Sequence, residues 1–180
     1  MNESKERKII VVGMENAGKS TIVKYLQIKS DDIPEKTPDM NPTKNVARTA
    51  IPEGNFIVWD FGGQEKYRNE YLEDPESYFH SVSYFYYVVD VQDYYRLFSS
   101  SMYFQAILNV VTKYSPEAKI VILFHKWDPD FDPSTKNLKE KFLKQVEPIL
   151  NKRNISYLTF DTSIFTPNTI KSAFNLELIE

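Results

Sequence analysis

A phosphate-binding pattern occurs near the start of the chain, where Gly13-Met14-Glu15-Asn16-Ala17-Gly18-Lys19-Ser20 matches G-x-x-x-x-G-K-[ST]. Its glycines allow the backbone to wrap round a polyphosphate, so that N–H groups and a helix N-terminus point at the negative charge. Lys19 would reach the terminal phosphates, and the Ser20 hydroxyl would coordinate Mg²⁺. A chance match is disfavoured because residues 9–12 predict a buried strand directly before the pattern and residues 20–30 predict a helix after it.

A second group of chemically suited residues is Trp59-Asp60-Phe61-Gly62-Gly63-Gln64-Glu65, which ends a predicted strand. Asp60 would hold the Mg²⁺ shell, Gly63 would touch a γ-phosphate through its backbone N–H, and Gln64 would orient an attacking water. The alternative is an ordinary turn after a strand. The presence of a phosphate loop in the same chain favours the functional interpretation.

A third group, His125-Lys126-Trp127-Asp128, follows a predicted strand over residues 119–124. The Asp128 carboxylate could accept hydrogen bonds from both N1–H and the exocyclic amine of guanine, a donor pair that adenine does not present. The aliphatic stem of Lys126 could lie along the purine face. A solvated loop is the plain alternative, but open α/β sheets place their ligands at this end of a strand.

The remaining sequence predicts the elements that hold these groups at one sheet edge. Residues 46–51 and 55–60 predict a hairpin, and residues 31–44 a polar loop. Asp74-Pro75 predicts a break within a helical stretch over 65–80. The helix over 97–114 is expected to turn Phe98 and Met102 inward, and Asp132 or Ser134 is expected to cap the helix that ends near residue 153. Further strands are predicted at 83–91 and 155–160, a loop at 161–164, and a closing helix at 167–179.

This alternation predicts an α/β fold with a doubly wound, mostly parallel six-stranded sheet, one antiparallel hairpin strand and helices on both faces. The aromatic residues of the strand over 83–91 are expected in the core. Tyr94 and Tyr95, just beyond that strand, are expected to be exposed and to contact a partner.

Composition restricts the function classes. The 180 residues suit one globular domain, and a net charge of −3 gives no sign of a nucleic-acid surface. Cysteine is absent, which suits the cytosol and excludes prenyl and palmitoyl anchors. The sequence has neither a membrane-spanning apolar run nor a signal-peptide pattern. We therefore expect a cytoplasmic protein that partners recruit to any membrane.

Together these stretches resemble the small GTPases of the Ras superfamily, over nearly the whole length of the chain. The segment at 59–65 is similar to the W-D-x-G-G-Q-[DE] motif of the Arf and Rag branches. The residues Tyr87-Val88-Val89-Asp90-Val91, His125-Lys126 and Thr162-Ser163-Ile164 are most similar to Rag. The resemblance implies a single G domain of the P-loop NTPase class over residues 1–180.

The resemblance also implies the ligands, GTP or GDP with Mg²⁺, and the residues that bind them. Lys19, Thr43 and Gln64 would be catalytic, and Ser20, Thr43 and Asp60 would hold the metal. The nucleotide would be bound by Glu15, Asn16, Ala17, Gly18, Lys19, Ser20, Thr21, Gly63, His125, Lys126, Asp128, Ser163 and Ile164, the last through its backbone N–H on guanine O6.

Several alternatives stay open at this point. The switch threonine is Thr43 or Thr37, of which Thr43 is favoured. His125 either ties the base loop to the phosphate loop, as Asn does in most families, or is simply packed. Arg48 and Arg68 are either salt-bridged surface residues, which is favoured, or arginines that assist hydrolysis in cis. Because Rag proteins continue into a roadblock-type domain, the chain is either a stand-alone domain or a fragment.

The predicted function is a GTP-binding molecular switch that hydrolyses GTP slowly without an activating partner. One alternative is a nucleotide-locked scaffold with little or no hydrolysis. Another is an adenine-nucleotide kinase or ATPase, which Asp128 and the Gly62-Gly63-Gln64 sequence disfavour. The expected partners are activating and exchange proteins, together with a second GTPase or a roadblock or longin-type protein, and no nucleic acid.

Overall fold

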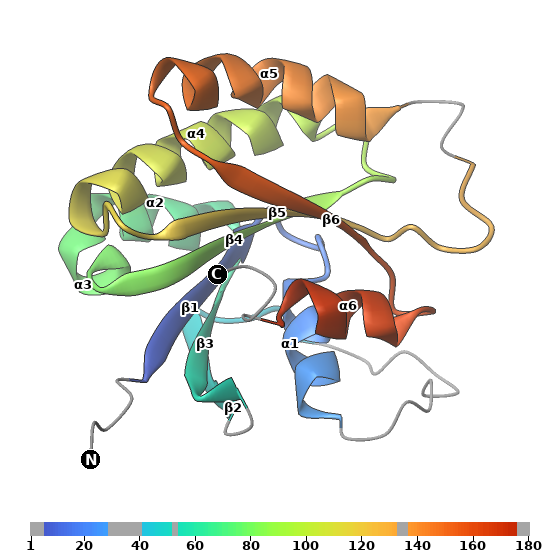
Figure 1. Ribbon diagram of the computed structural model, residues 1–180, viewed down its shortest axis with the longest axis horizontal. Coiled ribbons are helices and arrows are strands. Elements are labelled where there is room, and N and C mark those ends of the chain that lie inside the picture. The colour runs from blue at the N-terminus through green and yellow to red at the C-terminus, as the bar shows by residue number, and fades with distance from the viewer. Residues whose placement is uncertain (1–5, 29–40, 52–53, 133–136, 176–180) are drawn as a thin grey trace.

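The computed structural model describes residues 6–28, 41–51, 54–132 and 137–175. Its centre is a six-stranded sheet in the order β2-β3-β1-β4-β5-β6 (Figure 1). Strand β2 runs antiparallel to β3, and the other neighbouring pairs are parallel. This confirms the predicted fold class. The strands are β1 Arg7–Gly13, β2 Val46–Ile51, β3 Phe56–Phe61, β4 Val82–Asp90, β5 Lys119–His125 and β6 Tyr157–Thr162.

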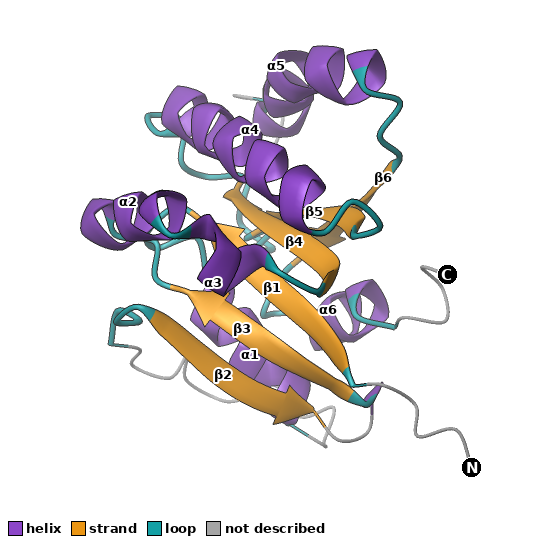
Figure 2. Ribbon diagram, turned by 90° about the vertical axis from the view of Figure 1, so that its left-hand side faces the viewer, coloured by secondary structure: helices purple, strands orange, loops and turns teal. Residues whose placement is uncertain are grey.

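Helices cover both faces of the sheet (Figure 2). Helices α1 (Lys19–Gln27) and α6 (Pro167–Ala173) lie on one face. The other face carries α2 (Glu65–Glu73), α3 (Pro75–Phe79), α4 (Leu97–Tyr114) and α5 (Leu138–Lys152). The predicted break at Asp74-Pro75 is confirmed, since α2 ends and α3 begins there.

Strand β1 shows why its apolar run is continuous. Alternate side chains of a strand point to opposite faces, so Ile9 and Val11 join the core under α1 and α6. Ile10 and Val12 join the core under α4 and α5. A strand covered on both sides needs apolar residues at every position.

The aromatic residues of β4 belong to the core, as predicted. Tyr86 stacks on Phe174 with ring centroids 4.2 Å apart and donates its hydroxyl hydrogen to the Ala173 carbonyl at 2.8 Å. On the opposite face, the Tyr87 hydroxyl donates to the Ser100 carbonyl at 2.7 Å. Both of these hydroxyls thus have a hydrogen-bond partner, which offsets the cost of removing them from water.

The bounds of α4 agree with the prediction, but two residues of its predicted apolar face lie outside the core. Phe98 is 68% exposed and Met102 is 51% exposed, whereas Ser100 and Ser101 are buried beside Phe104. The buried serines are accommodated because they hydrogen-bond, Ser101 to the Phe98 carbonyl and to Gln145. Polar residues at inward positions conceal the helical periodicity. Outside the helix, Tyr94 and Tyr95 are exposed as expected.

Several element ends differ from the predictions, and α1 ends at Gln27 instead of residue 30. Asn137 caps α5 by accepting a hydrogen bond from Glu140 N, so Asp132 is not the cap, and Ser134 lies outside the described residues. Strand β6 includes Asp161 and Thr162, which were predicted as loop. Helix α6 ends at Ala173, before the predicted end.

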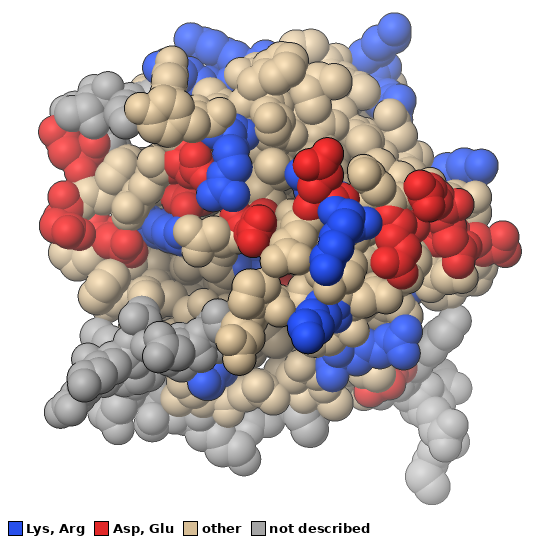
Figure 3. Space-filling model, turned by 180° about the vertical axis from the view of Figure 1, so that it is seen from behind, with Lys and Arg blue, Asp and Glu red and all other residues tan. Residues whose placement is uncertain are grey.

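The surface and the helices add two observations on the described residues. No helix among them is long and apolar enough to cross a bilayer. Figure 3 shows acidic and basic side chains interspersed over the face seen from behind, with apolar and uncharged residues between them.

Candidate nucleotide-binding site

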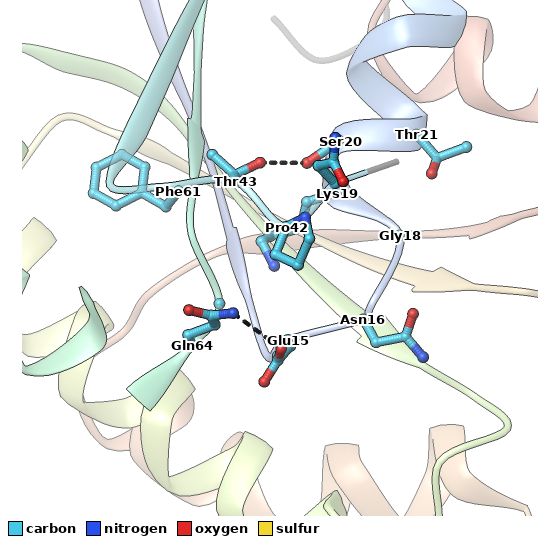
Figure 4. A pocket seen from close by; sticks show the side chains of 12 residues that line it. Glu15, Asn16, Gly18, Lys19, Ser20, Thr21, Pro42, Thr43, Phe61 and Gln64 are labelled. Atoms are coloured by element: carbon cyan, nitrogen blue, oxygen red, sulfur yellow. Dashed lines mark hydrogen bonds between the residues drawn. The ribbon is translucent and has the colours of Figure 1, made fainter. Parts of the chain in front are cut away.

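The phosphate loop joins β1 to α1 and forms the floor of a cavity of about 280 Å³ (Figure 4). The loop turns through left-handed backbone at Asn16, with φ 62°, and at Gly18, with φ 93°. Ala17, within the loop, turns its side chain into the core under α1. The structure therefore brings three separate segments to one cavity, which is lined by Glu15, Asn16, Gly18, Lys19, Ser20, Thr21, Asn41, Pro42, Thr43, Phe61, Gly63 and Gln64.

The three predicted metal ligands meet beside this cavity. The Ser20 and Thr43 hydroxyl oxygens lie 2.7 Å apart, and both hydroxyls donate to Asp60 Oδ2, Thr43 at 3.0 Å. Asp60 is 3% exposed, and its Oδ1 atom is buried without a hydrogen-bond partner. Burial raises the pKa of Asp60, and the Ser20 hydrogen bond and the Lys19 charge oppose this shift. Thr37, the alternative to Thr43, lies outside the described residues.

This donor set fits Mg²⁺. The ion prefers oxygen ligands and is commonly held by one or two carboxylates, with substrate phosphates and water completing its octahedron. Asp60 offers a buried carboxylate oxygen that lacks a partner, and Ser20 and Thr43 offer hydroxyls next to it. The described residues contain no competing cluster of three or more histidine or acidic side chains.

Lys19 lies in the floor of the cavity and is 5% exposed. Its ammonium group donates to the Met14 carbonyl at 2.8 Å, across the loop. Burial lowers the pKa of Lys19 to about 8, and the neighbouring Asp60 and Glu15 oppose that shift. A polyphosphate in the cavity would add negative charge beside the ammonium group and thereby favour its protonated form.

Gly62 and Gly63, which follow β3, allow the chain to pass close to the segment before β2 and to the phosphate loop. A Cβ atom at Gly63 would lie 2.4 Å from the Glu15 nitrogen, and one at Gly62 would lie 2.6 Å from the Thr43 carbonyl oxygen. The next residue, Gln64, directs its side chain at the cavity, where its amide donates to Glu15 Oε1 at 3.4 Å (Figure 4). Gln64 is therefore near the phosphate loop, as predicted. Its hydrogen bond to the Glu15 carboxylate was not predicted from the sequence.

His125, the last residue of β5, begins the base loop (residues 125–128) and contacts the phosphate loop (residues 13–20). Its imidazole is 2% exposed and packs on Gly18, where an added Cβ would lie 2.5 Å from His125 Cδ2. The other side of the ring places Nδ1 2.9 Å from the Thr162 hydroxyl. Burial and the adjacent Lys126 lower the pKa of His125 to about 3, so the ring is neutral near pH 7. Of the two interpretations, this geometry favours a tie between the loops.

Lys126 makes a second connection between the same loops. It adopts a positive φ of 70°, and its ammonium group donates to the Asn16 carbonyl at 2.8 Å and to Asp90 Oδ2 at 2.6 Å. The aliphatic stem therefore spans the distance between the two loops. Asp90, at the end of β4, is a site residue that the sequence analysis did not identify.

Asp128, the predicted base reader, is bonded at both carboxylate oxygens. Its Oδ1 accepts from the Ser163 hydroxyl at 2.9 Å, and its Oδ2 accepts from the Gln92 amide at 2.9 Å. Ile164 follows Ser163 and is half-buried. The Ser163 contact agrees with its predicted place in the site, whereas no sequence pattern indicated Gln92.

The arginines near the site make ring and loop contacts. Arg48 lies over the Trp59 ring at 4.1 Å, with Lys8 over the same ring at 3.8 Å. Arg68 lies 5.1 Å from the Tyr103 centroid. Arg96, which the sequence analysis did not identify, donates to the Glu15 carbonyl at 2.8 Å and pairs with Asp93.

Comparisons with known proteins agree with this geometry. Residues 8–176 match the family model described as the Gtr1/RagA G protein conserved region. Human ADP-ribosylation factor-like protein 5A is 33% identical over 88 residues, which cover 49% of this chain and 45% of the relative. ADP-ribosylation factor-like protein 5 of Caenorhabditis elegans is 41% identical over 69 residues, covering 37% and 35%. Each alignment thus spans less than half of the relative's own length.

A solved structure shows the same fold. The Arl6 BBS3 small GTPase from Trypanosoma brucei, with the bound nucleotide analogue GppNp, superimposes with a TM-score of 0.73. The match covers 96% of this chain and 95% of the other at 18% identity.

Proposed function

The chain belongs to the Gtr1/RagA family of G proteins, within the Rag/Arf-like branch of the Ras-superfamily small GTPases, and from this premise we propose that it is a Mg²⁺-dependent switch that hydrolyses GTP slowly. In this proposal the γ-phosphate of GTP and the Mg²⁺ ion hold the segment around Thr43 and the segment after Gly63 in place. Hydrolysis then releases both segments.

The convergence of Ser20, Thr43 and Asp60 is the observation that carries this proposal. These residues come from the start of α1, the segment before β2 and the end of β3, and their oxygens meet at the buried Asp60 carboxylate. When bound, Mg²⁺ would neutralise charge on the β- and γ-phosphate oxygens. Thr43 is hydrogen-bonded here to Ser20 and Asp60, the two other proposed ligands of the ion. The position of Thr43 would therefore depend on whether nucleotide and Mg²⁺ occupy the cavity.

The other residues have distinct proposed roles. Lys19 balances the charge of the terminal phosphates, and the Gly63 N–H contacts the γ-phosphate. Gln64 orients the attacking water. In this structure the Gln64 amide nitrogen donates to Glu15 at 3.4 Å, and in this proposal that contact breaks when the side chain turns to position water. We infer that this step contributes to a slow intrinsic rate.

The same contact supports the alternative of a nucleotide-locked scaffold. If Gln64 stays with Glu15 after GTP binds, the chain would retain GTP and present one conformation to its partners. The two functions differ in one measurable quantity, the rate at which bound GTP becomes GDP.

Partners and location are inferred from the family and from the surface. Activating and exchange proteins are expected for a G protein, and a second GTPase or a roadblock or longin-type protein is expected for a Rag-like one. The exposed Tyr95, Phe98 and Met102 provide apolar area for such contacts. We propose a cytoplasmic protein that partners bring to membranes.

The proposed function is tested by loading purified protein with GTP and Mg²⁺ and identifying the bound nucleotide by chromatography over hours. Conversion to GDP supports a slow GTPase, whereas persistent GTP supports the scaffold. An Asp60→Asn variant should lose Mg²⁺-dependent retention of nucleotide, and Asp74→Asn, at an exposed helix end, is the matched control. Absence of any retained guanine nucleotide in the wild type would overturn both functions.

A further inference from the structure

We propose that Gln92 is a specificity-determining positioning residue for guanine. Its side-chain amide donates to one oxygen of the Asp128 carboxylate, and the Ser163 hydroxyl donates to the other. The inference rests on the proposed role of Asp128 as the base reader. It adds a residue from the turn after β4 to a base site that is otherwise built from the segments after β5 and β6.

The Gln92 amide nitrogen has two donor hydrogens, and both have acceptors in the base loop. One donates to Asp128 Oδ2 at 2.9 Å, and the other donates to the Lys126 carbonyl at 2.8 Å. A single side chain therefore ties the backbone at residue 126 to the carboxylate at residue 128. The distances are those of well-formed hydrogen bonds.

Counting acceptor positions shows how this arrangement serves guanine. An ionised carboxylate offers about four lone-pair positions, two on each oxygen. Ser163 uses one position on Oδ1 and Gln92 uses one on Oδ2, so the bonds among the described residues leave one position on each oxygen. Guanine presents two adjacent donors, N1–H and the exocyclic amine, so the two remaining positions match it in number. Fixing both oxygens also fixes the plane of the carboxylate.

Gln92 is itself anchored to the rest of the site. Its backbone N–H donates to Asp90 Oδ1 at 2.9 Å, and Asp90 Oδ2 accepts from the Lys126 ammonium group at 2.6 Å. The same ammonium group reaches the Asn16 carbonyl of the phosphate loop. The base-reading carboxylate is thus connected through Gln92, Asp90 and Lys126 to the loop that would hold the phosphates.

The chemistry of the side chain predicts which replacements fail. Alanine removes both donors. Asp128 Oδ2 would then lose its hydrogen bond to residue 92, and the carboxylate could rotate about its Cβ–Cγ bond. Glutamate is of the same length but would place a second negative charge next to Asp128, which is unfavourable at this separation. Asparagine is one methylene shorter and would be unable to reach both acceptors from the same backbone position.

The test compares dissociation constants for GTP and for inosine triphosphate, which lacks the exocyclic amine, by competition against a fluorescent GDP. Gln92→Ala should weaken GTP binding about three- to tenfold, the effect of one or two hydrogen bonds. Inosine triphosphate should be affected less, so the preference for GTP falls. Gln92→Glu should lower this preference further. Gln105→Ala is the matched control, because Gln105 bonds to the Gln145 carbonyl between α4 and α5.

Three outcomes would contradict the inference. Equal weakening of both nucleotides would mean that Gln92 only supports the loop, and tighter GTP binding would mean that its amide competes with the base. In an Asp128→Asn background, a further loss of preference from Gln92→Ala would show that Gln92 acts elsewhere. A wild type without preference for GTP over inosine triphosphate would instead refute the role of Asp128, which separates the two failures.

Discussion

The imidazole of His125 rests on the bare Cα of Gly18, so the loop that would read the base and the loop that would hold the phosphates are in direct contact. Gly18 is in left-handed backbone, with φ 93°, and a methyl group there would lie 2.5 Å from the ring. The relative position of the two loops therefore depends on the absence of a side chain at residue 18.

Gly18→Ala should destabilise the protein and weaken nucleotide binding. The left-handed conformation alone costs a non-glycine residue roughly 1–2 kcal/mol, and the overlap with His125 adds to this. We expect a melting temperature lower by several degrees and nucleotide affinity lower by at least about tenfold. The double variant Gly18→Ala/His125→Ala relieves the overlap but not the backbone strain. Because removal of the buried ring has its own cost, His125→Ala is measured as well; if the double variant is destabilised by the full sum of the two single variants, the contact has been misassigned.

His125 should make the stability of the protein depend on acidic pH. Its pKa is lowered to about 3 by burial, so below the ordinary value of 6.5 the unfolded state binds more protons than the folded state. Stability from this residue is fully present above pH 6.5 and falls as the pH decreases towards 3, by roughly 2 kcal/mol between pH 6.5 and 5.

The non-titrating variant His125→Asn should lack this contribution. Urea unfolding of both proteins at pH 7 and pH 5 gives the comparison. The difference in unfolding free energy between wild type and variant should shift in favour of the variant at pH 5. A difference that does not change with pH would show that the pKa of His125 is not lowered in the folded state.

Glu15→Ala should increase the intrinsic rate of GTP hydrolysis, because Gln64 no longer has to leave a carboxylate. The Glu15–Gln64 bond is 3.4 Å long and exposed, so we expect only about a threefold increase.

Gln64→Leu should abolish hydrolysis and leave nucleotide binding intact. Single-turnover measurements on protein loaded with GTP determine both rates. An unaffected rate in Gln64→Leu would mean that this residue does not position the water.

Asp128→Asn should weaken GTP binding and favour xanthosine triphosphate. The amide replaces an acceptor oxygen with a donor, which suits the additional carbonyl of xanthine and opposes the amine of guanine. Hydrogen bonds to charged groups contribute about 1.5–3 kcal/mol, so the affinity for GTP should decrease at least about tenfold. Competition binding with both nucleotides provides the measurement. Unchanged GTP affinity would remove Asp128 from the base site.

The parts of the site that short motifs encode could be predicted from the sequence. Lys19 and Asp128 follow buried strands and Asp60 lies at the end of one, and the carboxyl ends of parallel strands meet at one edge of the sheet. The outward turn of Phe98 was missed because Ser100 and Ser101 occupy inward positions that an apolar residue would normally fill.

Contacts between distant segments could not be predicted in this way. Arg96 donates to the Glu15 carbonyl across 81 positions of sequence, and Gln92 bonds to Asp128 across 36. Neither residue lies in a spacing pattern, because its partner is set by the register of the sheet and the path of the loops. Only the folded arrangement shows that the segment between β4 and α4 contributes to both halves of the site.

The two tryptophans give the protein a pair of internal optical reporters. Trp59 precedes Asp60 and lies under the cationic groups of Lys8 and Arg48, whereas Trp127 stands between Lys126 and Asp128 and packs on Phe131. The sequence contains no other tryptophan. Replacing either one with phenylalanine would leave a single fluorophore, so that emission from Trp59 follows events at the phosphates and emission from Trp127 follows events at the base.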